Sequence, residues 1–164
     1  MFYVLLLVVC AAAAALDQLI KALVVANIPL GGSVQAIPGL FHLTYVQNTG
    51  AAFSMLEGAR TFFLILTAVF LAIMVYCAVK KVFPRPYFWF LAVITGGAIG
   101  NLIDRMLHGY VVDMFALDFM RFAVFNFADL CITFGAALLI LYALLFEKRQ
   151  KPKKEPECGN NHSV

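Results

Sequence analysis

The sequence predicts an all-α membrane protein of four transmembrane helices with a small extracytoplasmic β-rich loop subdomain. Of its 164 residues, 63% are hydrophobic and only 13% are charged, whereas a soluble domain carries about 25% charged residues. The mean hydropathy is +0.92. Continuous apolar runs are typical of spanning helices, while the strands of a membrane β-barrel would alternate polar and apolar residues. The composition therefore favours a helical membrane protein over a soluble domain or a barrel.

Four segments have the length and composition of spans. We expect them at about residues 2–26, 61–79, 87–103 and 129–146, because a helix needs about 20 apolar residues to cross a hydrocarbon core of ~30 Å. The N-terminal apolar run is shorter, but helix-forming residues continue it to about Ala26. It lacks the basic region that begins a cleaved signal peptide. We therefore expect it to be retained as the first span.

The segment between the first two spans, about residues 27–60, differs in character. Proline and glycine interrupt it, and Phe41 to Val46 is aromatic and β-branched, which predicts short strands and turns at the membrane surface. We expect residues 1–146 to form a single membrane-embedded domain. Residues 147–164 form a charged, proline-containing tail, which is typical of disorder.

The distribution of basic residues predicts the orientation in the membrane. Eight of the twelve Lys and Arg residues lie in the loop at residues 80–85 or in the tail after Glu147. The positive-inside rule therefore places both termini in the cytoplasm, with residues 27–60 and 104–128 outside. The net charge of +3 gives no indication of a nucleic-acid partner, and the four cysteines have no close pairs, which favours neither a disulfide framework nor a zinc site.

Ionisable residues near the spans gather at one level of the predicted bundle. Charged groups are costly in a bilayer and are functional candidates by default. At the outer ends of the first, third and fourth spans and in the loop between the last two lie Asp17, Lys21, Asp104, Arg105, Asp113 and Asp129. The inner halves of the spans are apolar. This asymmetry favours a site at the outer face over an ion pathway through the bundle.

The residue types at this level favour carboxylate chemistry. The sequence has no His-Glu-x-x-His zinc motif and no serine in a Gly-x-Ser-x-Gly setting. Two neighbouring carboxylates share a proton, so that one can accept a proton from water while the other donates to a carbonyl oxygen. Such a reaction requires no metal and no cofactor. Asp113 and Asp129 are sixteen residues apart, so only tertiary folding can bring them together.

Each of these residues also has a purely structural interpretation. Asn126 could cap the fourth helix, with Asp129 as a first-turn carboxylate. Asp17 and Lys21 could form an ion pair at i, i+4 spacing, and the Asp104–Arg105 pair could anchor a helix at the interface. Three glycines of the third span suit close helix packing in lipid: Gly96, Gly97 and Gly100.

Five sequence blocks together are far more specific than any one of them. In chain order they are Asp17–Lys21, Asn48–Phe53, Gly96–Arg105, Val111–Asp113 and Phe125–Asp129. They resemble, in the same order and on the same elements, the signature blocks of bacterial lipoprotein signal peptidases (signal peptidase II). One departure is Met114, where that family commonly has Phe after the aspartate.

This resemblance implies an aspartyl endopeptidase of the bacterial cytoplasmic (inner) membrane, with its active site at the outer face. It would remove the signal peptide from prolipoproteins by cutting before the diacylglyceryl-modified cysteine, using no cofactor and requiring no oligomer. Its partners would be those substrates and membrane lipids. The resemblance assigns catalysis to Asp113 and Asp129, and substrate binding to Asn48, Asn101, Arg105 and Asn126. Supporting roles fall to Asp17, Lys21, Gly50 and Asp104.

Two other classes of function stay open at the level of sequence. A small carrier or channel subunit would carry polar residues deep in several spans or inverted repeats, and the spans here show only isolated threonines. A non-catalytic protein could use the same cleft to bind lipid or lipoprotein. Neutralising Asp113 would leave the function of such a protein intact.

Overall fold

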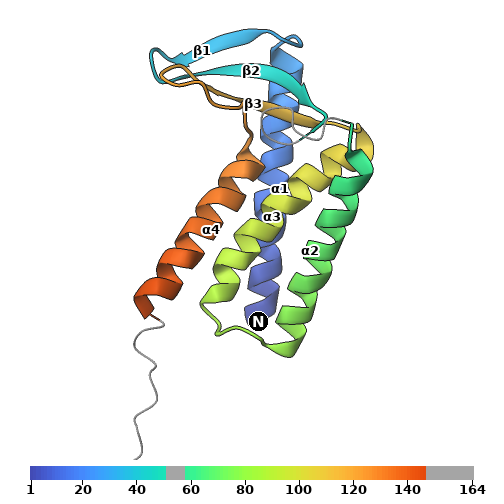
Figure 1. Cartoon of the computed structure of the whole chain (residues 1–164), viewed down its shortest axis with the longest axis vertical. Coiled ribbons are helices and arrows are strands. Elements are labelled where there is room, and N and C mark those ends of the chain that lie inside the picture. The colour runs from blue at the N-terminus through green and yellow to red at the C-terminus, as the bar shows by residue number, and fades with distance from the viewer. Residues whose placement is uncertain (51–57, 147–164) are drawn as a thin grey trace, which may run out of the picture.

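The computed structural model describes residues 1–50 and 58–146, and its core is a bundle of long helices. The helices are α1 (Phe2–Asn27), α2 (Arg60–Lys80), α3 (Tyr87–Leu107) and α4 (Phe127–Phe146). The strands are β1 (Ser33–Ile37), β2 (Phe41–Asn48) and β3 (Val111–Leu117), which form a sheet at one end of the bundle (Figure 1). All four helices are long and apolar enough to cross a membrane. The predicted fold class is therefore confirmed.

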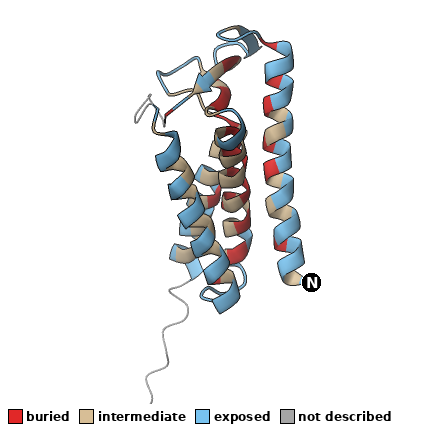
Figure 2. Ribbon diagram, turned by 90° about the vertical axis from the view of Figure 1, so that its right-hand side faces the viewer, coloured by how far each residue is buried: buried red, intermediate tan, exposed pale blue. Residues whose placement is uncertain are grey.

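Helix α3 lies at the centre of the bundle, where it contacts each of the other three helices. Buried residues face this centre, while the outer faces of the helices are exposed (Figure 2). The exposed positions include large apolar side chains such as Leu7, Val75 and Leu144. Apolar side chains on the outer surface are what a helix needs where lipid is the solvent.

Two glycines allow α3 to approach its neighbours closely. A Cβ atom on Gly96 would lie 2.6 Å from the backbone oxygen of Cys10 in α1, and one on Gly97 would lie 2.5 Å from the backbone oxygen of Ala128 in α4. Real Cβ atoms do not come so near to backbone oxygens. The interpretation of these glycines as helix-packing residues is confirmed, since small residues allow helix backbones to meet in a membrane.

The sheet is antiparallel, in the order β1-β2-β3. The first two strands come from the segment for which strands were expected. The third strand was not expected, because Asp113 was predicted to lie in a loop. Strand β3 pairs along its length with β2, more than sixty residues earlier in the chain. Successive strand residues face opposite sides. Met114 is fully buried with Val24 of α1 and Tyr45 of β2, so Asp113 faces the other way.

Candidate active site

A buried ion cluster lies where α1 meets α3. The Nζ atom of Lys21 is 2.8 Å from Oδ2 of Asp17 and 2.9 Å from Oδ2 of Asp104, and it donates a 2.9 Å hydrogen bond to Oδ1 of Asn101. All four residues are buried. The expected pairing of Asp17 with Lys21 is confirmed, and it extends to a second carboxylate. The alternative of Asp104 as an interfacial anchor is wrong, because Asp104 is only 1% exposed.

The two carboxylates of the cluster also tie other elements together. Asp17 accepts a 2.8 Å hydrogen bond from the backbone N–H of Ala128, at the start of α4, and Asp104 accepts one of 3.0 Å from Val112 in β3. A Cβ atom on Gly100 would lie 2.5 Å from Oδ2 of Asp17, so this glycine makes room for the carboxylate. The cluster thus fixes helix α4 and strand β3 relative to α1 and α3.

Gln18, which was not among the candidate site residues, also belongs to this network. Its Nε2 group donates to Oδ1 of Asp104 at 2.9 Å and to the backbone oxygen of Gly100 at 3.0 Å. Its place between Asp17 and Lys21, in the first of the five blocks, was the available signal. An amide beside two ionisable residues on a spanning helix needs a partner there, since lipid offers none.

The start of α4 is a reciprocal cap. The backbone N–H of Asp129 donates to Oδ1 of Asn126 at 2.9 Å, and the backbone N–H of Asn126 donates back to Oδ2 of Asp129 at 3.1 Å. This is the geometry of a capping box, and it starts the helix two residues before the expected position. The capping interpretation of both residues is therefore confirmed as local structure.

The same asparagine connects the two candidate catalytic carboxylates. Its Nδ2 group donates to Oδ1 of Asp113 at 2.6 Å and to Oδ1 of Asn101 at 3.1 Å. Asn101 in turn donates to Oδ1 of Asp129 at 2.9 Å. Asn126 is completely buried, so water does not compete for the hydrogen bonds of its side chain. Capping and site-building are thus two roles of one side chain.

Backbone pairing brings Asp113 to the start of α4. The N–H of Phe115 donates to the oxygen of Phe125 at 2.8 Å, and the N–H of Phe125 returns a 3.1 Å bond to Phe115. This bridge joins β3 to the residue just before Asn126. On the other side of β3, Asn48 pairs with Val111, which makes it a diagonal neighbour of Asp113 on the same face of the sheet. Its Nδ2 group donates to Oδ2 of Asp113 at 2.8 Å.

The environment of Asp113 favours its protonated form. Burial raises the pKa of the Asp113 carboxyl to about 6, and the nearby charge of Asp129 acts in the same direction. Hydrogen bonds from Asn48 and Asn126 and the charge of Lys21 oppose this rise in the pKa. Since the net effect is upward, Asp113 holds its proton to a higher pH than an ordinary aspartate does.

These groups line a cleft of about 420 Å³. Its polar lining includes both aspartates and all four predicted substrate-binding residues, and an apolar wall is formed by residues 122–125. Arg105 donates to the backbone oxygen of Gly50 at 3.2 Å, and its guanidinium lies 4.6 Å from the ring centroid of Phe63. Gly50 also donates its N–H to Oδ1 of Asn48 at 2.9 Å.

The structure thus brings all the predicted site residues into one connected region. Asp113, Asp129 and the substrate-binding set line the cleft, while Asp17, Lys21 and Asp104 lie behind it, joined to it by Asn101. Within residues 1–50 and 58–146, no group of three or more His, Cys, Asp or Glu side chains could hold a metal ion. Part of the second block, Ala51 to Phe53, lies outside the described residues.

Comparison with known proteins identifies the family of this chain. Residues 9–145 match the family described as Signal peptidase (SPase) II. A lipoprotein signal peptidase of Enterococcus faecalis is 42% identical over 142 residues, covering 85% of this chain and 87% of that protein. One of Streptococcus thermophilus is 50% identical over 129 residues, covering 77% and 83%.

A solved structure has a similar fold. A bacterial membrane enzyme, determined by the in meso method at 2.3 Å resolution, superposes with a TM-score of 0.83 at 30% identity. The match covers 92% of this chain and 93% of that one. These likenesses support a protease over the carrier and lipid-binding alternatives. This chain, a multi-pass bacterial membrane protein, therefore belongs to the signal peptidase II family.

Proposed function

We propose that this protein is an aspartyl endopeptidase that removes signal peptides from prolipoproteins by cutting before the diacylglyceryl-modified cysteine. Asp113 and Asp129 would be the catalytic pair. The observation that carries the proposal is that two asparagines connect the aspartates through hydrogen bonds. Asn126 donates to both carboxylates, with its side chain to Asp113 and with its backbone N–H to Asp129. Asn101 accepts a hydrogen bond from Asn126 and donates one to Asp129. Two carboxylates held in this way at the wall of a cleft form a preorganised acid–base pair.

In the proposed reaction, one carboxylate accepts a proton and the other donates one. Asp129, ionised, takes a proton from water as the water oxygen attacks the carbonyl carbon of the scissile bond. Asp113, which keeps its proton to a higher pH than an ordinary aspartate because its pKa is raised to about 6, donates that proton to the carbonyl oxygen. The resulting diol collapses when Asp129 passes its proton to the leaving nitrogen. The C–N bond then breaks, and one hydroxyl returns a proton to Asp113.

The other polar residues of the cleft would position the peptide. Arg105 lines the cleft and already donates to one backbone oxygen, that of Gly50, so it is suited to bind the carbonyl oxygens of an extended peptide. Asn48 and Asn126 would orient the Asp113 carboxylate through both of its oxygens. A lipidated cysteine anchored in the bilayer would reach this level with its scissile bond already confined, which lowers the entropic cost of catalysis.

The orientation and extent of the protein are part of the proposal. Both termini would be cytoplasmic, because the basic loop at residues 80–85 lies at the end of the bundle opposite the sheet (Figure 1). A reporter that works only in the cytoplasm should then be active when it is fused to the C-terminus, and a reporter that works only outside the cytoplasm should be inactive. Residues 1–146 would form the protease domain, so removal of residues 147–164 should leave cleavage intact. A single chain would suffice, since one chain contributes every group in the mechanism.

The test is cleavage of a diacylglyceryl-modified prolipoprotein by the purified protein in detergent. Asp113→Asn and Asp129→Asn should fold and lose activity, because each removes a titratable group. Asp118→Asn is the matched control: this carboxylate is at the sheet, bonded to His42 and Gln35 away from the cleft, and the variant should cleave normally. If both active-site variants still cleave, the pair is wrong and Asp104 is the next candidate.

A further inference from the structure

A second groove, remote from the catalytic cleft, opens on the side of the bundle between α1 and α2. Its cavity volume is about 410 Å³, within the range of ~300–1,000 Å³ typical of small-molecule sites. Phe88 and Ala92 of α3, both buried, form its floor, and exposed side chains such as Leu7 of α1 and Val75 of α2 form its walls. Because the walls are exposed and apolar, the groove opens toward the hydrocarbon of the membrane.

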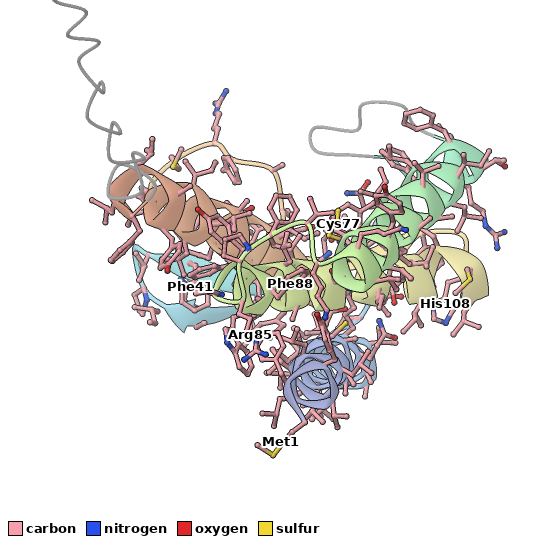
Figure 3. All side chains as sticks on the ribbon, turned by 90° about the horizontal axis from the view of Figure 1, so that it is seen from below. Met1, Phe41, Cys77, Arg85, Phe88 and His108 are labelled. Atoms are coloured by element: carbon pink, nitrogen blue, oxygen red, sulfur yellow. The ribbon has the colours of Figure 1, made fainter. Side chains whose placement is uncertain are left out.

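The groove lies at the end of the bundle that carries the basic loop. Lys81, which caps α2, is part of its lining. Arg85 is close by, with its guanidinium 5.5 Å from the ring centroid of Phe2 at the start of α1. Figure 3, viewed from this end, shows Arg85 on the side of the bundle where α1 lies, and the ring centroid of Phe88 is 6.4 Å from that of Tyr3 in α1. Tyr3, also in the lining, adds a hydroxyl at the same level.

Negative charge is located elsewhere in the part of the chain that the structure describes. The carboxylates among residues 1–50 and 58–146 all lie in the buried ion cluster, in the catalytic cleft or at the sheet: Asp17, Asp104, Asp113, Asp118 and Asp129. The cations of the basic end therefore have no described carboxylate at their own level. An apolar groove with a cationic rim matches a molecule that has a long hydrocarbon chain and an anionic head.

We propose that this groove binds an anionic glycerophospholipid from the leaflet at the basic end of the bundle. One acyl chain lies along Phe88 and Ala92 between α1 and α2, and the phosphate meets Lys81. The sequence after Phe146 is charged and polar, which does not suit an apolar groove. The catalytic cleft lies elsewhere, lined by residues of α3, α4 and the sheet, so lipid binding here does not depend on the proposed proteolysis.

The test uses photo-crosslinking in vesicles of phosphatidylcholine that contain a small fraction of phosphatidylglycerol with a diazirine in one acyl chain. The full chain is reconstituted, irradiated and digested, and the labelled peptides are identified. Label should map to the N-terminal half of α1 and the C-terminal half of α2. Unlabelled phosphatidylglycerol should compete for the site, and added phosphatidylcholine should not.

Two pairs of variants separate a site from general attraction. Lys81→Gln should weaken phosphatidylglycerol competition about five-fold, the effect of one lysine near a lipid surface, while Lys80→Gln, the neighbour outside the lining, should change it less than about two-fold. Val75→Phe should block labelling by filling the groove, while Val69→Phe, on α2 but not in the lining, should not. Both pairs alter exposed side chains, so the variants should fold.

Three outcomes would overturn the proposal. If Lys81→Gln and Lys80→Gln weakened competition by phosphatidylglycerol equally, the basic surface would attract lipid without a specific site. Equal competition by phosphatidylcholine would mean that the groove holds any acyl chain. Absence of label from α1 and α2 would mean that the groove is covered by something other than phospholipid.

Discussion

Replacement of Lys21 by methionine tests the buried ion cluster. The methionine has a similar length and no charge, so it removes the cation and leaves the volume nearly unchanged. The variant loses the contacts of Nζ with Asp17, Asp104 and Asn101, which lie between 2.8 and 2.9 Å. Two buried carboxylates then have no cation, although Ala128, Val112 and Gln18 still donate to them.

The expected cost follows from burial. Lys21 is 3% exposed and the carboxylates are 0% and 1% exposed, so water cannot replace the lost charge. Breaking a buried ion pair by removing one partner costs about 3–5 kcal/mol of unfolding free energy. For a chain of this size, about 2–4 °C of melting temperature corresponds to 1 kcal/mol, so the melting temperature should fall by roughly 6–20 °C. Because Asn101 loses a partner, cleavage should also fall, by about a hundred-fold.

The assay is thermal unfolding in detergent beside cleavage at a temperature where the variant is folded. Lys80→Met is the control, because that exposed lysine should contribute less than about 0.5 kcal/mol. The double variant Lys21→Met/Asp104→Asn should be less destabilised than the sum of its parts, since it removes one of the two isolated charges. A single variant as stable as the parent, or strictly additive effects, would refute the idea that the cluster holds a mutually stabilising charge network.

Three further predictions concern the cleft and the ion cluster behind it. Asn126→Ala should lose about 1 kcal/mol of unfolding free energy with its helix cap and also lose activity. Asn126→Ser should keep the cap and lose only activity. If Asn126→Ala and Asn126→Ser lost the same stability in urea unfolding, the assignment of both a capping and a site role to Asn126 would be contradicted. Because the pKa of Asp113 is raised to about 6, its proton is lost as pH rises above 6. The kcat/KM value should then fall about tenfold per pH unit, which a flat profile from about pH 6 to about 9 would contradict. Gly100→Ala would crowd the Asp17 carboxylate and should lower the free energy of unfolding by about 1–3 kcal/mol. The measurement is thermal unfolding, with Ala72→Ser on the exposed face of α2 as the control. A melting temperature equal to that of the parent would show that the carboxylate can move aside.

The sequence was informative wherever the solvent imposes the pattern. Lipid forbids unpaired backbone groups, so apolar runs of sufficient length must be helices, and all four were predicted within a few residues of their ends. The cost of burying charge in lipid also pointed to the few ionisable residues near the spans as candidates, and the structure places them in the cleft or in the ion cluster behind it. Aromatic and β-branched residues indicated the first two strands. Strand β3 was missed because its strongest stabilisation comes from β2, a distant segment.

Only the tertiary structure decided how these residues meet. Spacing placed Asp113 and Asp129 on different elements, and their approach depends on the backbone bridge between Phe115 and Phe125. Likewise, the pattern could not distinguish Asn126 as a cap from Asn126 as a site residue, and the structure gives it both sets of hydrogen bonds. The physical reason is range. Hydrophobicity and local capping act over a few neighbouring residues and can be recognised in sequence, whereas a hydrogen-bonded network in a buried cleft exists only after distant segments have packed together.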